Sequence, residues 1–383
     1  MESNNLLMDL ETVETPSFII DIEKLEKNLT ILEGIKKRTS CKILFAIKAF
    51  AMFKVFPMIR KKLDGICASS QDEARLGREE FNKEVHTHCV AYSQAAMASI
   101  LQYSDVVVFN SFHQWKRFRP MVHSKPNISC GIRVNPEHSE GPETMFDPCS
   151  VSSRLGVRIK NFEKNEMQGI SGLHFHTLCA HNSHALRRTL AAFEHSFHRY
   201  LYPLSWVNFG GGHQITRDDY DINLLCTLIN NFKDQYQVDV YLEPGESVVL
   251  NAGYLVASIL DIVSCDMPTV ILDTSATTHM PDVLEMPYRP HILGGYEKGS
   301  TPYSYRIFGV SCLSGDIIGE YSFEKPLHVG DKLIFSDMAH YTIVKNNTFN
   351  GIRLPSIFLY HPHKKHLEVV KKFSYDDYKM RLS

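Results

Sequence analysis

The chain has 383 residues, of which 44% are hydrophobic and 22% are charged, with a formal net charge of −2. This composition is typical of a globular protein with one large core or two domains, and the near-neutral charge argues against a general nucleic-acid-binding protein. The N-terminus does not resemble a signal peptide, no apolar run approaches the roughly 20 residues of a membrane span, and nine cysteines without a CxxC pair indicate reduced thiols in the cytoplasm.

Short apolar runs alternate with helical patterns through the first two thirds of the chain. The expected strands are residues 42–49, 65–69, 86–91, 106–110, 129–135, 170–178, 206–212 and 238–246. The expected helices between them are residues 21–38, 69–80, 93–102, 113–122, 184–201 and 219–236. Eight strands in repeated βα units predict an α/β fold, a closed (β/α)8 TIM-type barrel, with an open doubly wound sheet as the alternative.

After residue 248 the pattern changes to β-like runs separated by Gly, Pro and Asp. These runs are residues 254–263, 268–275, 305–313, 316–323, 331–337 and 339–345. They predict a mainly antiparallel β domain. We therefore expect a barrel domain over residues 15–248 and a C-terminal β domain over residues 249–383, which residues 1–14 can also join. The charged tail after residue 360 is expected to end in an exposed helix.

Lys48 lies among apolar residues in the segment LFAIKAF, near the end of the first expected barrel strand. Residues at the carboxyl ends of barrel strands face the active site. A lysine there, with burial favouring its neutral amine, is suited to form a Schiff base with pyridoxal 5′-phosphate (PLP). The alternative is a structural lysine whose amine extends to solvent.

Two further segments follow expected barrel strands. Gly210, Gly211 and Gly212 in NFGGGHQIT let the backbone approach a ligand and can offer amides to a phosphate, although a tight turn explains them equally. His174 and His176 in GLHFHTL share one face of a strand, which also suits zinc. No further ligand is evident for a metal, so we expect none, and an imidazole can instead stack on a cofactor ring.

Isolated polar residues in the remaining motifs add weaker signals. Glu243 in YLEPGES can hold a pyridinium nitrogen protonated, or it can be a structural carboxylate before a Pro-Gly turn. The segment SCLSGD supplies Cys312 and Asp316, and Tyr341 in AHYTIVK can reach a phosphate with its hydroxyl.

The ordered set AIK, HFH, GGG, EPG, SCLSGD and AHYT with FNG resembles the fold-type III PLP-dependent decarboxylases, across about residues 15–360. Ornithine, arginine and diaminopimelate decarboxylases belong to this group, and racemases share its barrel. The resemblance implies an alanine racemase-like barrel, bound PLP and a homodimer with shared active sites. It also implies that Cys312 crosses the dimer interface and helps to protonate the intermediate.

The resemblance assigns the cofactor-binding positions one by one. They are Lys48 (the anchor), Glu73 (a supporting acid), His176 (stacked on the ring), Cys179 (in place of a phosphate-binding serine), Gly210, Gly211 and Gly212 (the phosphate cradle), Glu243 (at the ring nitrogen) and Tyr341 (at the phosphate). The catalytic set is Lys48, His176 and Cys312.

Departures from the common motifs narrow the branch. Glu246 stands where relatives read EPGR, and Leu313 follows Cys312 where ornithine and diaminopimelate decarboxylases carry Asp and Glu, respectively. The segments FDPCSVSSRLG and LDTSATTHMPDVLEMPYRP resemble the carboxynorspermidine/carboxyspermidine decarboxylase branch instead. That branch implies decarboxylation to norspermidine or spermidine, with release of CO2, in polyamine biosynthesis.

A polyamine substrate carries ammonium groups, which carboxylates can recognise. The residues expected to bind substrate are Glu246 and Asp282, then Asp316, Glu285 and Asp147, with Arg154 as a pocket cation or structural partner and His279 along the channel. The alternatives are a diaminopimelate or other basic amino-acid decarboxylase, a racemase and a non-catalytic regulatory homologue. The sequence does not decide between the two polyamines, because they differ by one methylene.

Overall fold

The structure is a computed structural model that describes residue 10, residues 13–140 and residues 147–383. These residues form two compact units. One comprises residues 27–248, and the other comprises residues up to 26 together with residues 249–383. Most of the segment 1–14 lies outside the described residues, as does Phe146 of the FDPCSVSSRLG motif.

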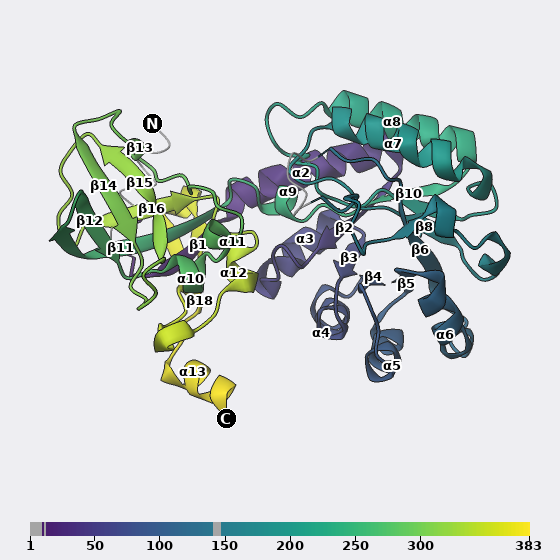
Figure 1. Ribbon diagram of the computed structural model, residues 1–383, viewed down its shortest axis with the longest axis horizontal. Helices are drawn as coiled ribbons and strands as arrows, with labels where there is room; N and C mark the ends of the chain where they lie inside the picture. The colour runs from purple at the N-terminus through teal and green to yellow at the C-terminus, as the bar shows by residue number, and fades with distance from the viewer. Residues whose placement is uncertain (1–9, 11–12, 141–146) are drawn as a thin grey trace. The chain divides into compact units, whose positions relative to one another are not determined.

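Eight apolar runs of the first unit form parallel strands (Figure 1). The strands are β2 (Lys42–Ala46), β3 (Gly65–Ala68), β4 (Glu84–His88), β5 (Val106–Phe109), β6 (Ser129–Asn135), β8 (Gly172–His174), β9 (Trp206–Asn208) and β10 (Asp239–Leu242). They pair in this order, and β10 pairs with β2. The sheet is therefore closed, which confirms the barrel and rules out the open doubly wound alternative.

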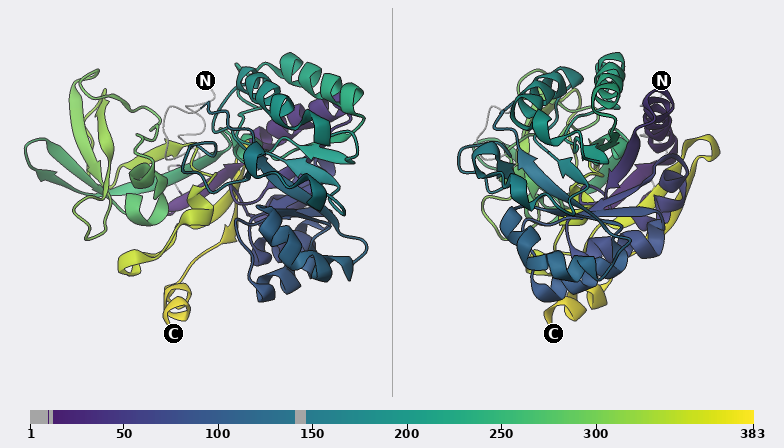
Figure 2. Two further views of the ribbon diagram at one scale, coloured as in Figure 1. Left: turned by 45° about the vertical axis from the view of Figure 1, so that its right-hand side comes forward. Right: turned by 90° about the vertical axis from the view of Figure 1, so that its right-hand side faces the viewer.

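A helix precedes the first of these strands and other helices follow most of them, outside the ring of strands (Figure 2). They are α2 (Ile22–Thr39), α3 (Phe56–Lys62), α4 (Gln71–Leu76), α5 (Gln94–Tyr103), α6 (Phe112–His123), α7 (Ser183–Phe197) and α8 (Ile222–Tyr236). Ser, Asn and Asp side chains cap the first amides of several of these helices, as at Ser93 and Asp221, which fixes where those helices begin. The described link between β6 and β8 contains only β7 (Val157–Arg158) and two short 3-10 turns.

The barrel interior is filled by large side chains that need small partners. Trp206 on β9 packs where a Cβ at Gly131 or Gly172 would overlap its ring. At the amino-terminal ends of the strands, Glu84 accepts hydrogen bonds from His86 and from the Tyr241 hydroxyl. The interior is therefore a packed core, and the opposite end of the barrel is left for a site.

The second unit is a mainly antiparallel sheet. Its strands are β1 (Ser17–Asp21), β11 (Gly253–Ser264), β12 (Pro268–Leu272), β13 (Tyr296–Glu297), β14 (Tyr303–Phe308), β15 (Ile317–Phe323), β16 (Lys332–Ser336), β17 (Ser356–His361) and β18 (His366–Lys371). Their order is β13-β15-β14-β12-β11-β1-β17-β18, with β16 also paired to β11. Among the described strands of this unit, the pairs β1–β17 and β12–β14 are parallel and the others are antiparallel.

Short helices complete the chain. They are α9 (Glu246–Val249), α10 (Ala276–His279), α11 (Asp282–Glu285), α12 (Thr342–Lys345) and the exposed α13 (Tyr375–Leu382). The run 339–345, predicted as a strand, is instead the turn that leads into α12, because its apolar residues pack on the β core from a helix. Each helix within the described ranges is too short or too polar to cross a membrane.

The division of the chain differs from the expected domains at the start. The sequence placed residue 15 in the barrel, but β1 pairs with β11 and β17 and so belongs to the β unit. The strands β17 and β18 were not predicted.

Candidate active site

The predicted cofactor residues of the barrel unit all follow the carboxyl ends of strands. Lys48 lies two residues after β2, Glu73 opens α4 after β3, and His176 lies two residues after β8. The glycine loop follows β9, and Glu243 follows β10 directly. Because the carboxyl ends of parallel strands meet at one end of a barrel, the structure brings these residues to a common site.

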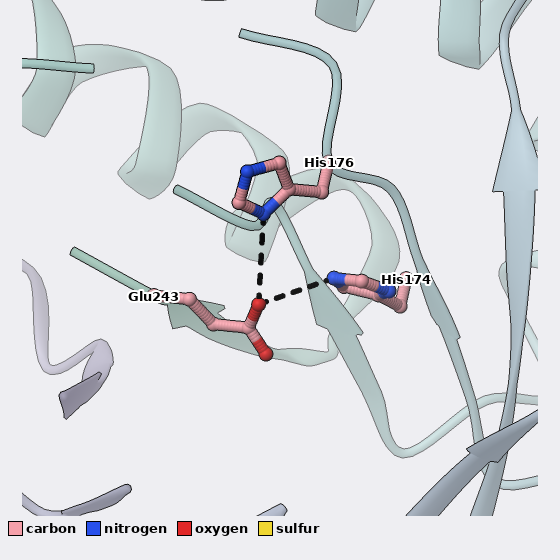
Figure 3. A group of neighbouring side chains, drawn as sticks. All are labelled: His174, His176 and Glu243. Carbon is pink, nitrogen blue, oxygen red and sulfur yellow. Dashed lines mark hydrogen bonds and ion pairs between the residues drawn. The ribbon is translucent and has the colours of Figure 1, made fainter. Parts of the chain in front are cut away.

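Glu243 lies at the centre of this site (Figure 3). Its side chain is 9% exposed, and each carboxylate oxygen accepts a hydrogen bond. Asn208 Nδ2 donates to Oε1 over 2.8 Å, and His174 Nε2 donates to Oε2 over 3.2 Å. Burial opposes ionisation, but the interactions with His174 and then His176 together outweigh it and hold the pKa of Glu243 well below its usual range. Glu243 is therefore a buried carboxylate anion.

His176 is fixed by the glycine loop. The Gly211 amide donates to His176 Nδ1 over 3.2 Å, so the ring proton resides on Nε2. Nδ1 also lies 3.8 Å from the Glu243 carboxylate, but because Nδ1 carries no proton it does not donate a hydrogen bond to that group. Burial, followed by the charge of Lys48, lowers the pKa of His176 to about 3. The ring is neutral and can stack on another ring.

Lys48 is close enough to the acids of the site for its charge to act on them. Burial raises the pKa of Glu73, and the Ser69 amide and Lys48 oppose this rise. Ser69 donates its amide to Glu73 Oε2 over 2.6 Å. Burial also raises the pKa of the Cys179 thiol, with Glu246 adding to the rise and Lys48 opposing it. Lys48, Glu73, His176 and Cys179 thus belong to one electrostatic neighbourhood.

The glycine loop requires glycine for steric reasons. A Cβ at Gly211 would overlap the Glu243 carbonyl, and a Cβ at Gly212 would overlap the Leu178 carbonyl. Gly212 also has a φ of +82°. The Gly210 amide donates to Asn208 Oδ1 and the Gly211 amide donates to His176, so these two amides are engaged. The Gly212 amide donates to no described residue and remains for an anion.

His174, His176 and Glu243 also have the composition of a metal site, with one ligand atom each within 4.8 Å of the others. Two histidines and a carboxylate can bind zinc. Here, however, His176 Nδ1 accepts the Gly211 amide and Glu243 Oε2 accepts the His174 N–H. The ligand atoms are already satisfied by hydrogen bonds, which favours an organic cofactor over a metal.

Glu246 begins α9 and is held by the loop that follows the glycines. Gln214 Nε2 donates to Glu246 Oε1 over 2.6 Å, and Arg217 donates to Gln214 Oε1 over 2.7 Å. Gln214 thus connects the carboxylate at position 246 to a cation. Glu246, at the position where relatives have an arginine, is therefore linked through Gln214 to the cation Arg217.

Two residues of the barrel unit that were predicted to bind substrate, Asp147 and Arg154, make no hydrogen bond or ion pair with the predicted cofactor residues that the structure describes. Asp147 accepts hydrogen bonds from the Ser139 hydroxyl and from the Cys149 amide. Arg154 is exposed and lines a cavity of about 500 Å³ that also includes Ser111 and Lys160. None of the predicted PLP-binding residues lines that cavity.

The remaining predicted residues lie in the β unit. Cys312 is exposed, and Tyr341 has a φ of +58°, which is strained for a bulky residue. His279 is fully buried, and its Nδ1 bonds to the Thr274 hydroxyl. Asp316 is buried and accepts hydrogen bonds from the Thr277 amide and the Ser311 hydroxyl, contacts that a structural role explains.

Asp282 and Glu285 share one ammonium group. Lys345 Nζ, from α12, is paired with both carboxylates. The side chain of Asp282 is 14% exposed and that of Glu285 is 58% exposed. The two acids can therefore hold an ammonium group, and in this structure a lysine of the same unit provides it.

The sequence interpretation gave no cofactor role to three polar residues of the barrel interior, although it named one of them, His174, as a possible zinc ligand. Asn208 and His174 hold Glu243, as described above. Arg133 on β6 is buried and donates to the His176 carbonyl over 2.9 Å. Burial lowers the pKa of Arg133 to about 10, with Glu243 opposing the fall, so the guanidinium is charged at neutral pH. The signal was available, since Arg133 is a lone cation in an apolar run of the sequence, as Lys48 is.

Comparisons with known proteins agree with this geometry. The family model "Pyridoxal-dependent decarboxylase, C-terminal sheet domain" matches residues 18–339. Carboxynorspermidine/carboxyspermidine decarboxylase of Campylobacter jejuni subsp. jejuni serotype O:6 is 41% identical over 385 residues, which cover 98% of this chain and 100% of that protein. Carboxyaminopropylagmatine decarboxylase of Synechocystis sp. is 38% identical, over 97% of this chain and 96% of that protein.

Solved structures of decarboxylases are also similar to this chain. The crystal structure of carboxynorspermidine decarboxylase complexed with norspermidine, from Campylobacter jejuni, has a TM-score of 0.90 and 39% identity, covering 96% of this chain and 100% of that one. Diaminopimelate decarboxylase from Helicobacter pylori has a TM-score of 0.81 at 16% identity, which supports the fold alone. The chain belongs to the family of pyridoxal-dependent decarboxylases and is a PLP enzyme.

Proposed function

We propose that the protein decarboxylates carboxynorspermidine or carboxyspermidine, giving norspermidine or spermidine and CO2 in polyamine biosynthesis. The observation that carries this proposal is the likeness, over nearly the full length of both chains, to a relative of that name at 41% identity. A structural relative of 39% identity was solved with norspermidine bound. The departures at Glu246 and Leu313 support the same branch.

The barrel end fits PLP by its chemistry. A loop that tolerates no Cβ provides a close backbone approach for a phosphate, and the Gly212 amide has no described acceptor. Glu243 is an anion suited to a protonated ring nitrogen, and His176 is a neutral ring that its tautomer holds in place. Lys48 would anchor the aldehyde, with Glu73 and Cys179 beside it and Tyr341 at the phosphate. PLP bound there supplies an electron sink for the pair left by departing CO2.

Side chains of the protein would then hold the proton on the cofactor ring and deliver a proton to the product. Glu243 would hold the proton of the ring nitrogen, and His176 would stack on the ring. We assign proton delivery to the α-carbon to Cys312, whose thiol is exposed in the β unit and which relatives contribute across a dimer interface. The proposal therefore includes a homodimer, which sedimentation would test. It also includes a cytoplasmic location, which nine free cysteines support.

Substrate ammonium groups require carboxylates. We place Glu246 first, because Gln214 orients it and because a carboxylate beside a phosphate is unfavourable unless a cation joins them. Asp282 and Glu285 come second, since the substrate ammonium would have to replace that of Lys345. Asp316, Asp147 and His279 have contacts that a structural role accounts for, and Arg154 lines the cavity that contains none of the predicted PLP-binding residues.

A second candidate substrate comes from a specific relative. The Synechocystis protein of 38% identity is named carboxyaminopropylagmatine decarboxylase. Diaminopimelate has weaker support, because a diaminopimelate decarboxylase of Methanocaldococcus jannaschii is 28% identical over only 40% of this chain. Membership of a decarboxylase family removes the support for a racemase or a non-catalytic homologue.

The test is a substrate panel on the PLP-loaded enzyme, with CO2 release as the readout. The panel contains carboxynorspermidine, carboxyspermidine, carboxyaminopropylagmatine, meso-diaminopimelate and ornithine. We expect the highest kcat/KM for the first two. Turnover of meso-diaminopimelate alone would sink the proposal, and a preference for carboxyaminopropylagmatine would select the second candidate.

A further inference from the structure

His174 is a buried polar residue to which the assigned cofactor set gives no role. It ends β8 two residues before His176 and is 2% exposed. Its Nε2 lies 3.2 Å from Glu243 Oε2, whereas its Nδ1 is buried without a hydrogen-bond partner among the described residues. An unsatisfied buried nitrogen is costly, so packing alone would favour an apolar residue here. The one hydrogen bond of this ring goes to Glu243.

The protonation of the ring follows from these contacts. Burial lowers the pKa of His174, so the ring is neutral and carries one proton. Since Nδ1 has no partner and Nε2 faces a carboxylate, that proton lies on Nε2. Arg133 and Lys48 add to the fall in the pKa of His174, whereas Glu243 opposes it. The titratable and charged groups around His174 come from the neighbouring strands. They are Lys48 after β2, Cys67 on β3, His88 on β4 with its ring 5.5 Å away, Arg133 on β6, and His176 and Glu243.

His174 and Asn208 hold opposite oxygens of the same carboxylate. Asn208 bonds Oε1 and His174 bonds Oε2, so the carboxylate cannot rotate without losing one of the two bonds. Asn208 also accepts the Gly210 amide, which connects the carboxylate to the glycine loop. His174 has no hydrogen bond to the glycine loop within the described residues. Its hydrogen bond to Glu243 acts on the orientation and charge of that carboxylate.

We propose that His174 is a positioning residue for the decarboxylation, holding the Glu243 carboxylate as an anion in the orientation that receives the N–H of the cofactor ring. This inference rests on the proposed role of Glu243 in PLP binding, and it does not depend on which polyamine is the substrate. Without the His174 donor, Glu243 would rotate and protonate more easily. The ring nitrogen would then lose its proton more easily, and the electron sink would weaken.

The test compares three replacements of His174 in the full-length, PLP-loaded enzyme. His174→Leu removes the donor at similar volume. His174→Gln keeps an N–H near the position of Nε2, and His174→Asn places an amide near Nδ1, out of reach of Glu243. The matched control is His86→Leu, which breaks a buried His–Glu pair of the same barrel at the amino-terminal ends of its strands (Nε2 to Glu84 Oε1, 2.8 Å). The readouts are PLP affinity, the pH dependence of the cofactor's visible absorbance, kcat and KM.

We expect His174→Leu to lower kcat by about 10- to 100-fold, the range for losing one hydrogen bond to a charged group, with a small change in KM. The pH midpoint of the absorbance should move in His174→Leu and His174→Asn and return in His174→Gln. His86→Leu should leave the absorbance and its pH midpoint unchanged. A folded His174→Leu enzyme with the wild-type kcat and pH midpoint would overturn the proposal.

A second comparison applies if His174→Leu does not fold. Equal kcat and equal pH midpoints for His174→Gln and His174→Asn would then overturn the proposal, because only Gln reaches the carboxylate. The absorbance and PLP-affinity readouts need no substrate. Failure of every polyamine in the panel would therefore contradict the proposed function while leaving the role of His174 to be decided by the spectra.

Discussion

Replacing Glu84 by Gln should destabilise the barrel by an amount that depends on pH. Glu84 begins β4, at the end of the barrel opposite the site, and its carboxylate meets three donors. These are His86 Nε2 at 2.8 Å, the Tyr241 hydroxyl at 2.9 Å and Lys42 Nζ at 3.3 Å. Burial opposes its ionisation, but His86, Lys42 and Tyr241 outweigh burial and lower the pKa of Glu84 to about 2.

The size of the effect follows from proton linkage. A pKa that falls from 4.5 in the unfolded chain to about 2 in the folded protein corresponds to about 3 kcal/mol of stability, at about 1.4 kcal/mol per pKa unit. Because the folded pKa is depressed, this stability is present above pH 4.5 and is lost as the pH falls towards 2. By pH 3, under half of it should remain.

The assay is urea denaturation of the wild-type protein and Glu84→Gln at several pH values between 7 and 3. We expect the difference in unfolding free energy to be about 3 kcal/mol at pH 7 and to shrink as the pH falls. The control is Glu79→Gln, which breaks an exposed pair with Arg75 and should cost under about 1 kcal/mol at any pH. A Glu84→Gln difference that is constant with pH would refute the reasoning.

Three further predictions concern the site. Lys48→Ala should abolish the visible absorbance of bound PLP, and an absorbance that persists would remove Lys48 as the anchor. Gly212→Ala should weaken PLP binding measured by fluorescence, because a Cβ would overlap the Leu178 carbonyl. The control Gly299→Ala has a similar φ of +79° but open space around it, and it should bind PLP normally. Equal PLP affinities of the two variants would contradict a phosphate-binding role for the glycine loop. Glu246→Gln should raise KM for the polyamine substrate with little change in kcat, and unchanged kinetics would exclude it from substrate binding.

The sequence predicted the barrel well because its strands are local signals. Seven of the eight apolar runs contain a strand of the closed sheet, from KILFA at β2 to DVYL at β10, and the run at 86–91 overlaps the end of β4 (Glu84–His88). The β unit was harder, since β1 pairs with β11 and β17, more than 230 residues away in the chain, and no local pattern reports such pairing. The run at 339–345 was ambiguous because short apolar runs fit either a strand or a buried helix.

For the site, the motifs predicted which residues follow the strand ends but not how their hydrogen bonds are distributed. Spacing alone could not reveal that Gly210 and Gly211 use their amides within the protein, or that Lys345 is paired with Asp282 and Glu285. These contacts depend on side chains from different strands and loops. Arg133 could have been found, because an arginine in an apolar strand needs a partner for its charge.

The most direct test of the account is CO2 release by the PLP-loaded enzyme from carboxynorspermidine and carboxyspermidine, measured beside Lys48→Ala. We predict turnover of at least one of these two substrates by the wild-type enzyme and none by the variant. A PLP-loaded wild-type enzyme that releases no CO2 from either substrate, but does so from meso-diaminopimelate, would contradict the central claim.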